Sequence, residues 1–281
     1  MFGFPRLVQL AFLTGLAVSF VGGLTAGLGM GFDLGTQWPG PPAALIATAL
    51  RGSLEPVHRF LTVAAGVLYV AVLAYAFKVR GRVLVLAALA VGFLVATALT
   101  GRMVLLVLGG EVPRPYSFAV YPLNNALALF AVGAMALLWA MLTPAEPADR
   151  AYLYRGAAAW GFLSSVTGAY MLGYHKITRE QFQYALWPPT PDPVWALHIL
   201  GAALMAALGA AALLLDRKAD FWRLAFAISI IAQPLTGLLM IRGASADPWA
   251  PGVQTGFHAA FAHLAVISSF VIYAKSKYGR R

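Results

Sequence analysis

Eight long apolar segments constrain this chain more than any other feature of its sequence. They cover approximately residues 6–30, 56–77, 83–108, 119–142, 157–174, 193–215, 222–241 and 255–274. Each segment is long enough for a helix to cross a hydrocarbon layer of about 30 Å. Charged residues make up 11% of the chain, whereas soluble domains contain about 25%. The sequence therefore predicts an all-α integral membrane protein with eight transmembrane helices.

The chain has a formal net charge of +10 and no cysteine. Without cysteine, disulfides, thiolate metal sites, iron–sulfur clusters and covalently attached c-type haem are excluded. A positive charge in a membrane protein is typical of loops that face the cytoplasm. We therefore expect the lipid bilayer, and no nucleic acid, among the partners of the chain.

The basic residues indicate on which side of the membrane each connection lies. Thirteen of the 20 fall on one side, namely Arg6, Lys78, Arg80, Arg82, Arg150, Arg155, Arg217, Lys218, Arg223, Lys275, Lys277, Arg280 and Arg281. The other side has Arg51, Arg59, Arg114, Lys176, Arg179 and Arg242, and Arg102 lies inside the third segment. By the positive-inside rule, we expect a plasma-membrane protein of a prokaryote with both termini in the cytoplasm.

Three short motifs occur twice, in the same order. The pairs are Trp38-Pro39 and Trp187-Pro188, Glu55-Pro-Val and Asp192-Pro-Val, and Thr100-Gly101 and Thr236-Gly237. An even number of spans in each half relates the halves as parallel repeats. We therefore predict two four-helix bundles, at residues 1–142 and 157–281, joined by a cytoplasmic linker at residues 143–156.

Three of the five histidines open apolar segments at a similar depth. His58, His198 and His258 lie 20, 18 and 17 residues before the first charged residue at the cytoplasmic end of their segments. These positions agree to within about one helical turn and lie toward the outer face. Two histidines at one depth on different helices of a bundle can hold one haem iron. His198 and His258 are therefore a candidate haem pair, the alternative being histidines that form hydrogen bonds across closely packed helices.

His263 is an alternative ligand to His258. It lies five residues further along the same segment and therefore deeper in the membrane. His175, beside Lys176 at the end of the fifth segment, is expected to be an exposed loop residue.

The first half of the chain lacks a second histidine. His58 opens the second segment, but Leu123-Asn124-Asn125 occupies the position that corresponds to His258. Asparagine is a poor ligand for iron, so a haem held by His58 would keep an open coordination position. An open position suits a reacting iron, whereas two histidine ligands suit electron transfer.

Three charged residues lie near His58 in the predicted membrane. Glu55 is one helical turn from His58 and could accept a proton, stabilise a cation or orient the imidazole. The alternative is a structural ion pair with Arg59, which is four residues from Glu55. Arg59 and Arg102 could also bind haem propionates.

These residues resemble the haem A synthase family of membrane proteins. The resemblance rests on eight spans in two halves, on Glu55-x-x-His58-Arg59, on the Trp-Pro pair before it, and on the histidines that open the sixth and eighth segments. Gln233-Pro-Leu-Thr-Gly237 in the seventh segment is also similar to that family. The resemblance covers nearly the whole chain.

The resemblance implies an oxidoreductase that converts the C8 methyl of haem O to a formyl group, which yields haem A for terminal oxidases. It implies a haem b between His198 and His258 as the electron relay. It also implies a substrate haem in the first half, where Glu55 and His58 would be catalytic. The chain departs from the family in lacking loop cysteines, in Ile199 after His198, and in Asn124 or Asn125 at the fourth histidine.

Haem O synthase or a terminal oxidase is the protein partner that this resemblance implies, and a homo-oligomer is compatible with it. Two other functions fit the sequence. One is a membrane cytochrome b that carries electrons in a respiratory complex without modifying haem. The other is a transporter built from parallel repeats, which would leave the shared depth of the histidines unexplained.

Overall fold

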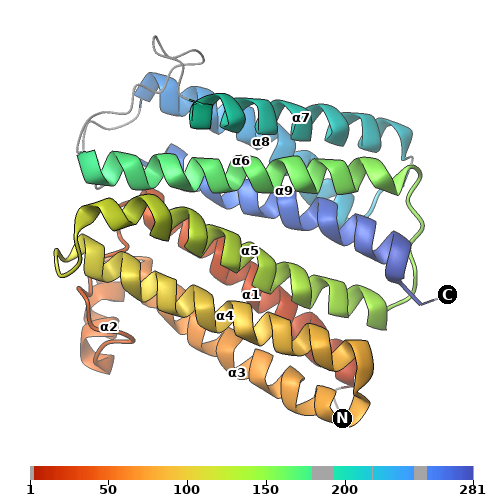
Figure 1. Cartoon of the computed structure of the whole chain (residues 1–281), viewed down its shortest axis with the longest axis horizontal. Coiled ribbons are helices and arrows are strands. Elements are labelled where there is room, and N and C mark those ends of the chain that lie inside the picture. The colour runs from red at the N-terminus through yellow and green to blue at the C-terminus, as the bar shows by residue number, and fades with distance from the viewer. Residues whose placement is uncertain (1–2, 179–192, 217, 244–251, 281) are drawn as a thin grey trace.

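The computed structural model describes residues 3–178, 193–216, 218–243 and 252–280, and these residues are almost entirely helical (Figure 1). The helices are α1 (Phe4–Gly27), α2 (Pro42–Leu50), α3 (Glu55–Val79), α4 (Gly81–Leu108), α5 (Ser117–Leu142), α6 (Ala151–Thr178), α7 (Pro193–Leu215), α8 (Phe221–Gly243) and α9 (Val253–Tyr278), with a 3-10 turn at Arg114–Tyr116. No strand is found in the part of the chain that the structure describes.

Seven of these helices are long and apolar enough to cross a membrane, namely α1, α3, α4, α5, α7, α8 and α9. They coincide with seven of the eight predicted segments. The remaining segment, 157–174, which is the fifth in the chain, lies within α6, and α6 is not among the seven. Its sequence is more polar, because Ser164, Ser165 and Thr167 interrupt the apolar residues. The chain is thus an all-helical, multi-pass membrane protein, and the eighth span stays a prediction.

Prolines mark where several helices begin. Pro5, Pro42 and Pro56 stand in the first turn of α1, α2 and α3, where a missing N–H costs no helical hydrogen bond. Helix α2 was not expected, since the sequence indicated a long loop at residues 31–55. A run of Ala, Leu and Ile after the two prolines explains it, because these residues favour a helix.

The long helices pack in two groups. Helices α1, α3, α4 and α5 contact one another in a closed ring, and α6, α7, α8 and α9 form a second ring. The rings meet where α1 and α5 pack on α9 and where α5 packs on α6. Both chain ends lie at the same end of the bundle (Figure 1). The internal duplication proposed for this arrangement stays a prediction, as do the domain limits.

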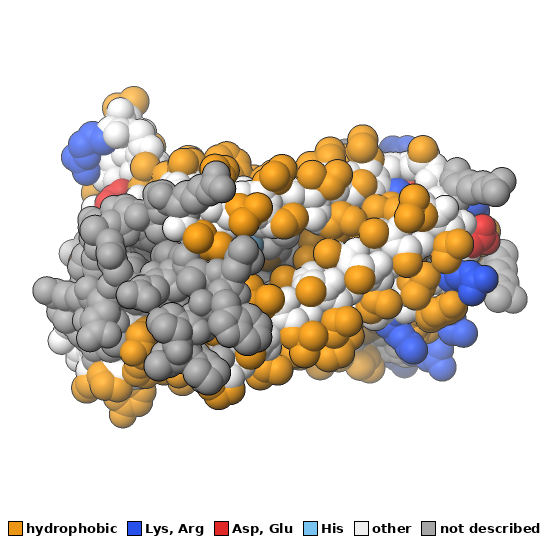
Figure 2. Space-filling model, turned by 90° about the horizontal axis from the view of Figure 1, so that it is seen from above, with side chains coloured by type: hydrophobic (Ala, Val, Ile, Leu, Met, Phe, Trp, Pro, Cys, Tyr) orange, Lys and Arg blue, Asp and Glu red, His pale blue; other side chains and the backbone are white. Residues whose placement is uncertain are grey.

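The outer surface of the bundle is apolar along its sides. Figure 2 shows hydrophobic side chains over the length of the helices and a group of Lys and Arg side chains at one end. An apolar belt with charges at its end is the surface that a lipid bilayer stabilises.

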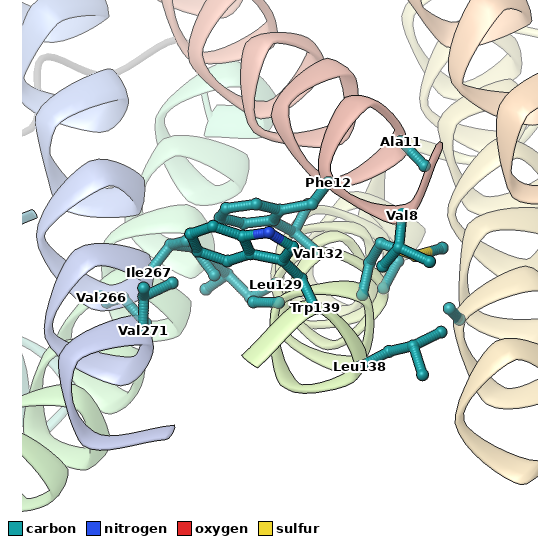
Figure 3. Close-up of a cluster of buried hydrophobic side chains, with 14 of the residues drawn as sticks. Val8, Ala11, Phe12, Leu129, Val132, Leu138, Trp139, Val266, Ile267 and Val271 are labelled. Atoms are coloured by element: carbon teal, nitrogen blue, oxygen red, sulfur yellow. The ribbon is translucent and has the colours of Figure 1, made fainter. Parts of the chain in front are cut away.

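An aromatic cluster joins the two rings near the end that carries the termini. The Phe12 ring of α1 lies 5.5 Å from Trp139 of α5 and 5.4 Å from Trp222 of α8, measured between centroids. Figure 3 shows Phe12 stacked on Trp139, with Ile267 and Val271 of α9 beside them. These side chains are buried, so they hold helices from both rings together.

The linker between the rings is bound to the end of α9. Its backbone and that of Arg280 exchange two hydrogen bonds, from Ala145 N to Arg280 O at 2.8 Å and from Arg280 N to Thr143 O at 2.9 Å. Lys275 forms an ion pair with Glu146 and lies 4.8 Å from the centre of the Trp139 ring. The linker therefore fixes α5 and α6 against the last turn of the chain.

We expect Phe12→Ala to destabilise the protein by about 3–5 kcal/mol, because it leaves a cavity between the two rings of helices. Leu13→Ala is the matched control, since the neighbouring Leu13 faces outward. Thermal unfolding of the detergent-solubilised variants measures the difference. Equal unfolding temperatures for the two variants would contradict this role of the cluster.

Candidate functional site

One cavity of about 650 Å³ lies between the two rings of helices. All eight long helices contribute to its wall, which is mostly apolar. Every predicted site residue lines it, namely Glu55, His58, Arg59, Arg102, Asn124, Asn125, His198, His258 and His263. A large apolar cavity with a few polar groups is the usual form of a ligand-binding site. The fold thus brings into one space residues that lie more than 200 positions apart.

The His198 and His258 rings are neighbours, with centroids 6.1 Å apart and planes tilted by 56°. An imidazole nitrogen lies about 2 Å from a metal that it binds. Two imidazoles on opposite sides of one metal therefore have centroids about 6 Å apart, once the ring radii are added. The observed separation suits a metal held between the two rings.

Backbone carbonyls of the neighbouring helices fix both rings. His198 Nδ1 lies 2.8 Å from the carbonyl oxygen of Ser164, and His258 Nδ1 lies 3.1 Å from that of Gln233. A carbonyl only accepts, so each Nδ1 carries the proton and donates it. Neither Nε2 has a hydrogen bond within the described ranges of the chain. This is the usual arrangement of metal-binding histidines, whose second nitrogen is held by an outer partner.

The donor set fits a metal that brings its own macrocycle. Within the described residues, no group of three or more His, Asp or Glu side chains could hold a bare metal ion. If both Nε2 atoms bound one metal, four further positions would have to be filled, which is the number that a porphyrin supplies. Alanines 202, 203, 259 and 262 line the cavity near the pair and leave space for a flat ligand.

The same local contact occurs four times in the chain. In each case a histidine or asparagine packs against a glycine of the preceding long helix, and a Cβ on that glycine would lie 2.8 to 3.5 Å from the side chain. The four pairs are Gly22 with His58, Gly101 with Asn124, Gly168 with His198, and Gly237 with His258. At Gly22 and Gly168 the Cβ would lie within 3.0 Å of the imidazole, so these two positions need a residue without a side chain, whereas the other two distances are ordinary contacts.

The carbonyl partners follow the same pattern. The residue four positions before the glycine is Val18, Thr97, Ser164 or Gln233, and in the last three cases its carbonyl contacts the packed side chain. His58 Nδ1 is buried and forms no hydrogen bond of good geometry, although the Val18 carbonyl is its nearest backbone acceptor. The four sites are therefore variants of one structural unit.

Asn124 occupies the one of these four positions that has no histidine. Its Nδ2 donates to the Thr97 carbonyl at 2.8 Å and lies 2.9 Å from the Thr100 hydroxyl. The amide nitrogen thus takes the place that Nδ1 has in His198 and His258. These bonds hold the amide nitrogen against α4, and asparagine offers iron no imidazole nitrogen at this position.

His263 and Asn125 bind each other instead of pointing separately into the cavity. His263 Nε2 lies 2.7 Å from Asn125 Nδ2, and the Ser165 hydroxyl donates to Asn125 Oδ1 at 3.1 Å. His263 Nδ1 is buried without a hydrogen-bond partner in the described part of the chain. These contacts join α9, α5 and α6 and occupy the nitrogen that an axial ligand would use, so the geometry favours His258 over His263 as a ligand.

Glu55 and Arg59 form a buried ion pair at the start of α3. Glu55 is 2% exposed and Arg59 is 3% exposed, and Arg59 Nη2 lies 2.5 Å from Glu55 Oε1. The second carboxylate oxygen accepts from Leu34 N at 2.9 Å. Arg59 also donates to the carbonyls of Gly35, Gln37 and Pro39. The pair therefore holds a cap loop, residues 31–40, over the cavity, where Gly31 and Trp38 contribute to the wall.

Arg102 lines the cavity from α4 and is also exposed at the surface of the bundle. No ion pair of Arg102 is found among the residues that the structure describes. Its guanidinium is therefore available to an anionic group of a ligand. The side chain of His175, together with Trp187-Pro188 and Asp192 of the predicted repeat, lies outside the described residues.

The sequence did not predict which residues fix the histidines: Gln233, Gly101 and Gly237 were named only as motif residues, and Ser164, Gly22 and Gly168 were missed. A signal was present, because Thr167-Gly168 repeats the Thr-Gly pairs at residues 100–101 and 236–237. The glycines and their carbonyl partners lie on helices other than those of the histidines, so only packing shows which ring each one meets.

Neither a comparison with protein-family models nor one with curated proteins gives a match to this chain. The class that the fold and the site define is an all-helical membrane protein with a histidine-lined cavity between two groups of helices.

We expect Arg59→Ala to release the cap loop, because it removes three hydrogen-bonded carbonyl contacts and leaves Glu55 buried without its cation. Hydrogen–deuterium exchange of residues 31–40 measures the release as faster exchange. Lys78→Ala is the control, since Lys78 is exposed near the opposite end of the same helix. Unchanged exchange in the Arg59 variant would show that the loop is held by other contacts.

Proposed function

We propose that this chain is a haem A synthase-like oxidoreductase that oxidises the C8 methyl of haem O to a formyl group. The observation that carries the proposal is the recurring unit in which a side chain packs on a glycine and a helix carbonyl. Three of its four positions are histidines, and two of them, His198 and His258, lie within 6.1 Å of each other. This is the arrangement expected of one closed and one open haem site.

The second half holds haem b in this proposal. When bound there, haem b supplies one-electron redox chemistry. The role of the protein is to hold both Nδ1–H groups in hydrogen bonds to the carbonyls of Ser164 and Gln233. Both Nε2 atoms then remain available to the iron. The apolar wall of α7 and α8 excludes water from the pair and lowers the local dielectric constant.

The first half binds haem O as the substrate. His58 is the one ligand that this half offers, because the Asn124 amide is held by Thr97 and Thr100. The iron of the substrate would keep an open position on the side of Asn124. Glu55 lines the same cavity and is the nearest carboxylate for a proton released at the oxidised methyl. Arg102, which has no ion partner within the described residues, would bind a propionate.

We also propose that α6 is the eighth span and that residues 1–142 and 157–281 are parallel repeats. Each half contains two of the four units. One unit joins the first and second long helices of that half, and the other joins the third and fourth. Such a correspondence supports duplication more strongly than short sequence motifs do. The orientation that follows is a prokaryotic plasma-membrane protein with both termini in the cytoplasm and the haem sites toward the outer face.

A membrane cytochrome b without haem-modifying activity is the second candidate. The contacts of Glu55 favour it, because both carboxylate oxygens are already engaged, with Arg59 and with Leu34 N. A carboxylate that only holds the cap loop would not take part in chemistry. The two functions share the haem b site and differ in the first half.

A pyridine haemochrome spectrum of the protein purified from a host that supplies haem O distinguishes these functions. Haem A or haem O together with haem b supports the synthase, and haem b alone supports the cytochrome. A protein without haem contradicts both. We expect Glu55→Ala to retain haem b and to lose haem A formation, and unchanged haem A formation would remove Glu55 from the mechanism.

We predict that His198→Ala and His258→Ala each abolish the low-spin haem b signal, because a six-coordinate iron needs both ligands. His263→Ala is the matched control, and we expect it to keep the signal, since its Nε2 contacts Asn125. Optical and electron paramagnetic resonance spectra of the three variants test this. Loss of the signal in the His263 variant alone would reverse the assignment of the ligands.

We predict that Asn124→His closes the first-half site. The new imidazole would meet the Thr97 carbonyl as His258 meets that of Gln233, which gives a second low-spin signal and stops haem A formation. Asn125→His is the control, because Asn125 points toward His263 and we expect no second signal from it. A single low-spin signal in the Asn124 variant would contradict the equivalence of the four positions.

A further inference from the structure

Helix α2 is the one described helix that lies outside the two rings. It follows the cap loop, has α3 as its main packing partner, and runs across the direction of the long helices (Figure 1). It lies at the end of the bundle away from the chain termini, only five residues before α3 begins. A helix in this orientation lies parallel to the plane of the membrane that the long helices cross.

The face of α2 turned away from α3 is apolar. Ile46 is 62% exposed and Leu50 is 84% exposed, while Thr48 is buried against the protein. Ala43 and Ala47 are exposed as well and share the face of Ile46 and Leu50, because they are three or four residues apart. No charged residue lies within α2, and Arg51 follows directly after it. In water, this face would leave a large apolar area unburied.

Exposed apolar side chains are also found on the first turns of α3. Val57 and Phe60 are exposed there, Phe60 by 72%. These two residues belong to a helix that is long and apolar enough to cross the membrane. They therefore mark where the hydrocarbon layer begins, and α2 lies beside that level. A short apolar helix followed by an arginine is suited to the boundary between acyl chains and phosphate groups.

We propose that α2 is an interfacial helix that inserts Ile46 and Leu50 into the lipid at the membrane surface. The occupant of its apolar face is thus the bilayer, with Arg51 placed at the headgroup phosphates. Because α2 continues from the cap loop, this anchor fixes the height of the cap above the cavity. The ion pair of Glu55 and Arg59 holds the other end of the loop. The inference rests on the membrane-crossing helices and does not depend on haem.

Site-directed spin labelling tests the proposal directly, because the chain has no native cysteine. Ile46→Cys and Leu50→Cys carry the label on the proposed lipid face. Phe60→Cys is the reference for a position in lipid, and Gln37→Cys, on the exposed cap loop, is the reference for water. Each variant is placed as a single copy in lipid nanodiscs, and collision rates with oxygen and with a water-soluble nickel chelate are measured.

We expect the ratio of oxygen to nickel collisions at residues 46 and 50 to be several-fold above that at Gln37 and close to that at Phe60. A ratio equal to that of Gln37 would show that the face is in water and would overturn the proposal. Low collision rates with both reagents would show that protein covers the face and would overturn it too. Ala47→Cys provides a third position on this face that removes little side chain.

One further comparison tests whether a second copy of the chain covers the apolar face of α2. Discs that hold two copies of the chain are measured beside discs that hold one. A fall in oxygen collisions at residues 46 and 50 that occurs only with two copies would assign the face to an interface between copies. Equal collision rates in both preparations, with the high oxygen ratio, support lipid as the occupant.

Discussion

The hydrogen bond from three of the four packed side chains to a carbonyl of the neighbouring helix is the contact on which the site depends. In the membrane interior, water is absent as a hydrogen-bond partner, so a ring nitrogen needs a partner within the protein. The carbonyls of Ser164 and Gln233 serve this purpose for His198 and His258, and that of Thr97 serves it for Asn124. Because each bond joins two helices, it fixes the direction of the ring and the packing of the helices together.

The glycines make these bonds sterically feasible. A ring can reach a carbonyl on the neighbouring helix only if no side chain lies between them, and Gly168 leaves this space for His198, where a Cβ would lie 3.0 Å from the ring. The cavity follows from the same choice, since small residues leave space that larger ones would fill. The contact of a histidine or asparagine with a glycine therefore serves both the packing of the helices and the shape of the cavity. It occurs twice in each half of the chain.

The charged groups at the start of α3 illustrate a different constraint. A carboxylate and a guanidinium that are both buried must neutralise each other, and Glu55 and Arg59 do so while binding the cap loop. The sequence was compatible with a catalytic Glu55 and with a structural ion pair, because residues four apart on a helix are neighbours whatever their role. Only the folded loop reveals that Leu34, Gly35 and Pro39 supply the remaining partners. The pair thus connects the wall of the cavity to the surface of the protein.

The sequence by itself predicted seven of the long apolar helices, because the length of an apolar run is a local property. It did not separate His258 from His263 or Asn124 from Asn125. Neighbouring positions on a helix point in different directions, and packing alone sets which partner each side chain meets. The sequence also did not predict α2, although its Ala, Leu and Ile residues favour a helix, because the segment is too short to cross a membrane. Tertiary structure decided the roles of the four cavity residues, because the partner of each lies on another helix.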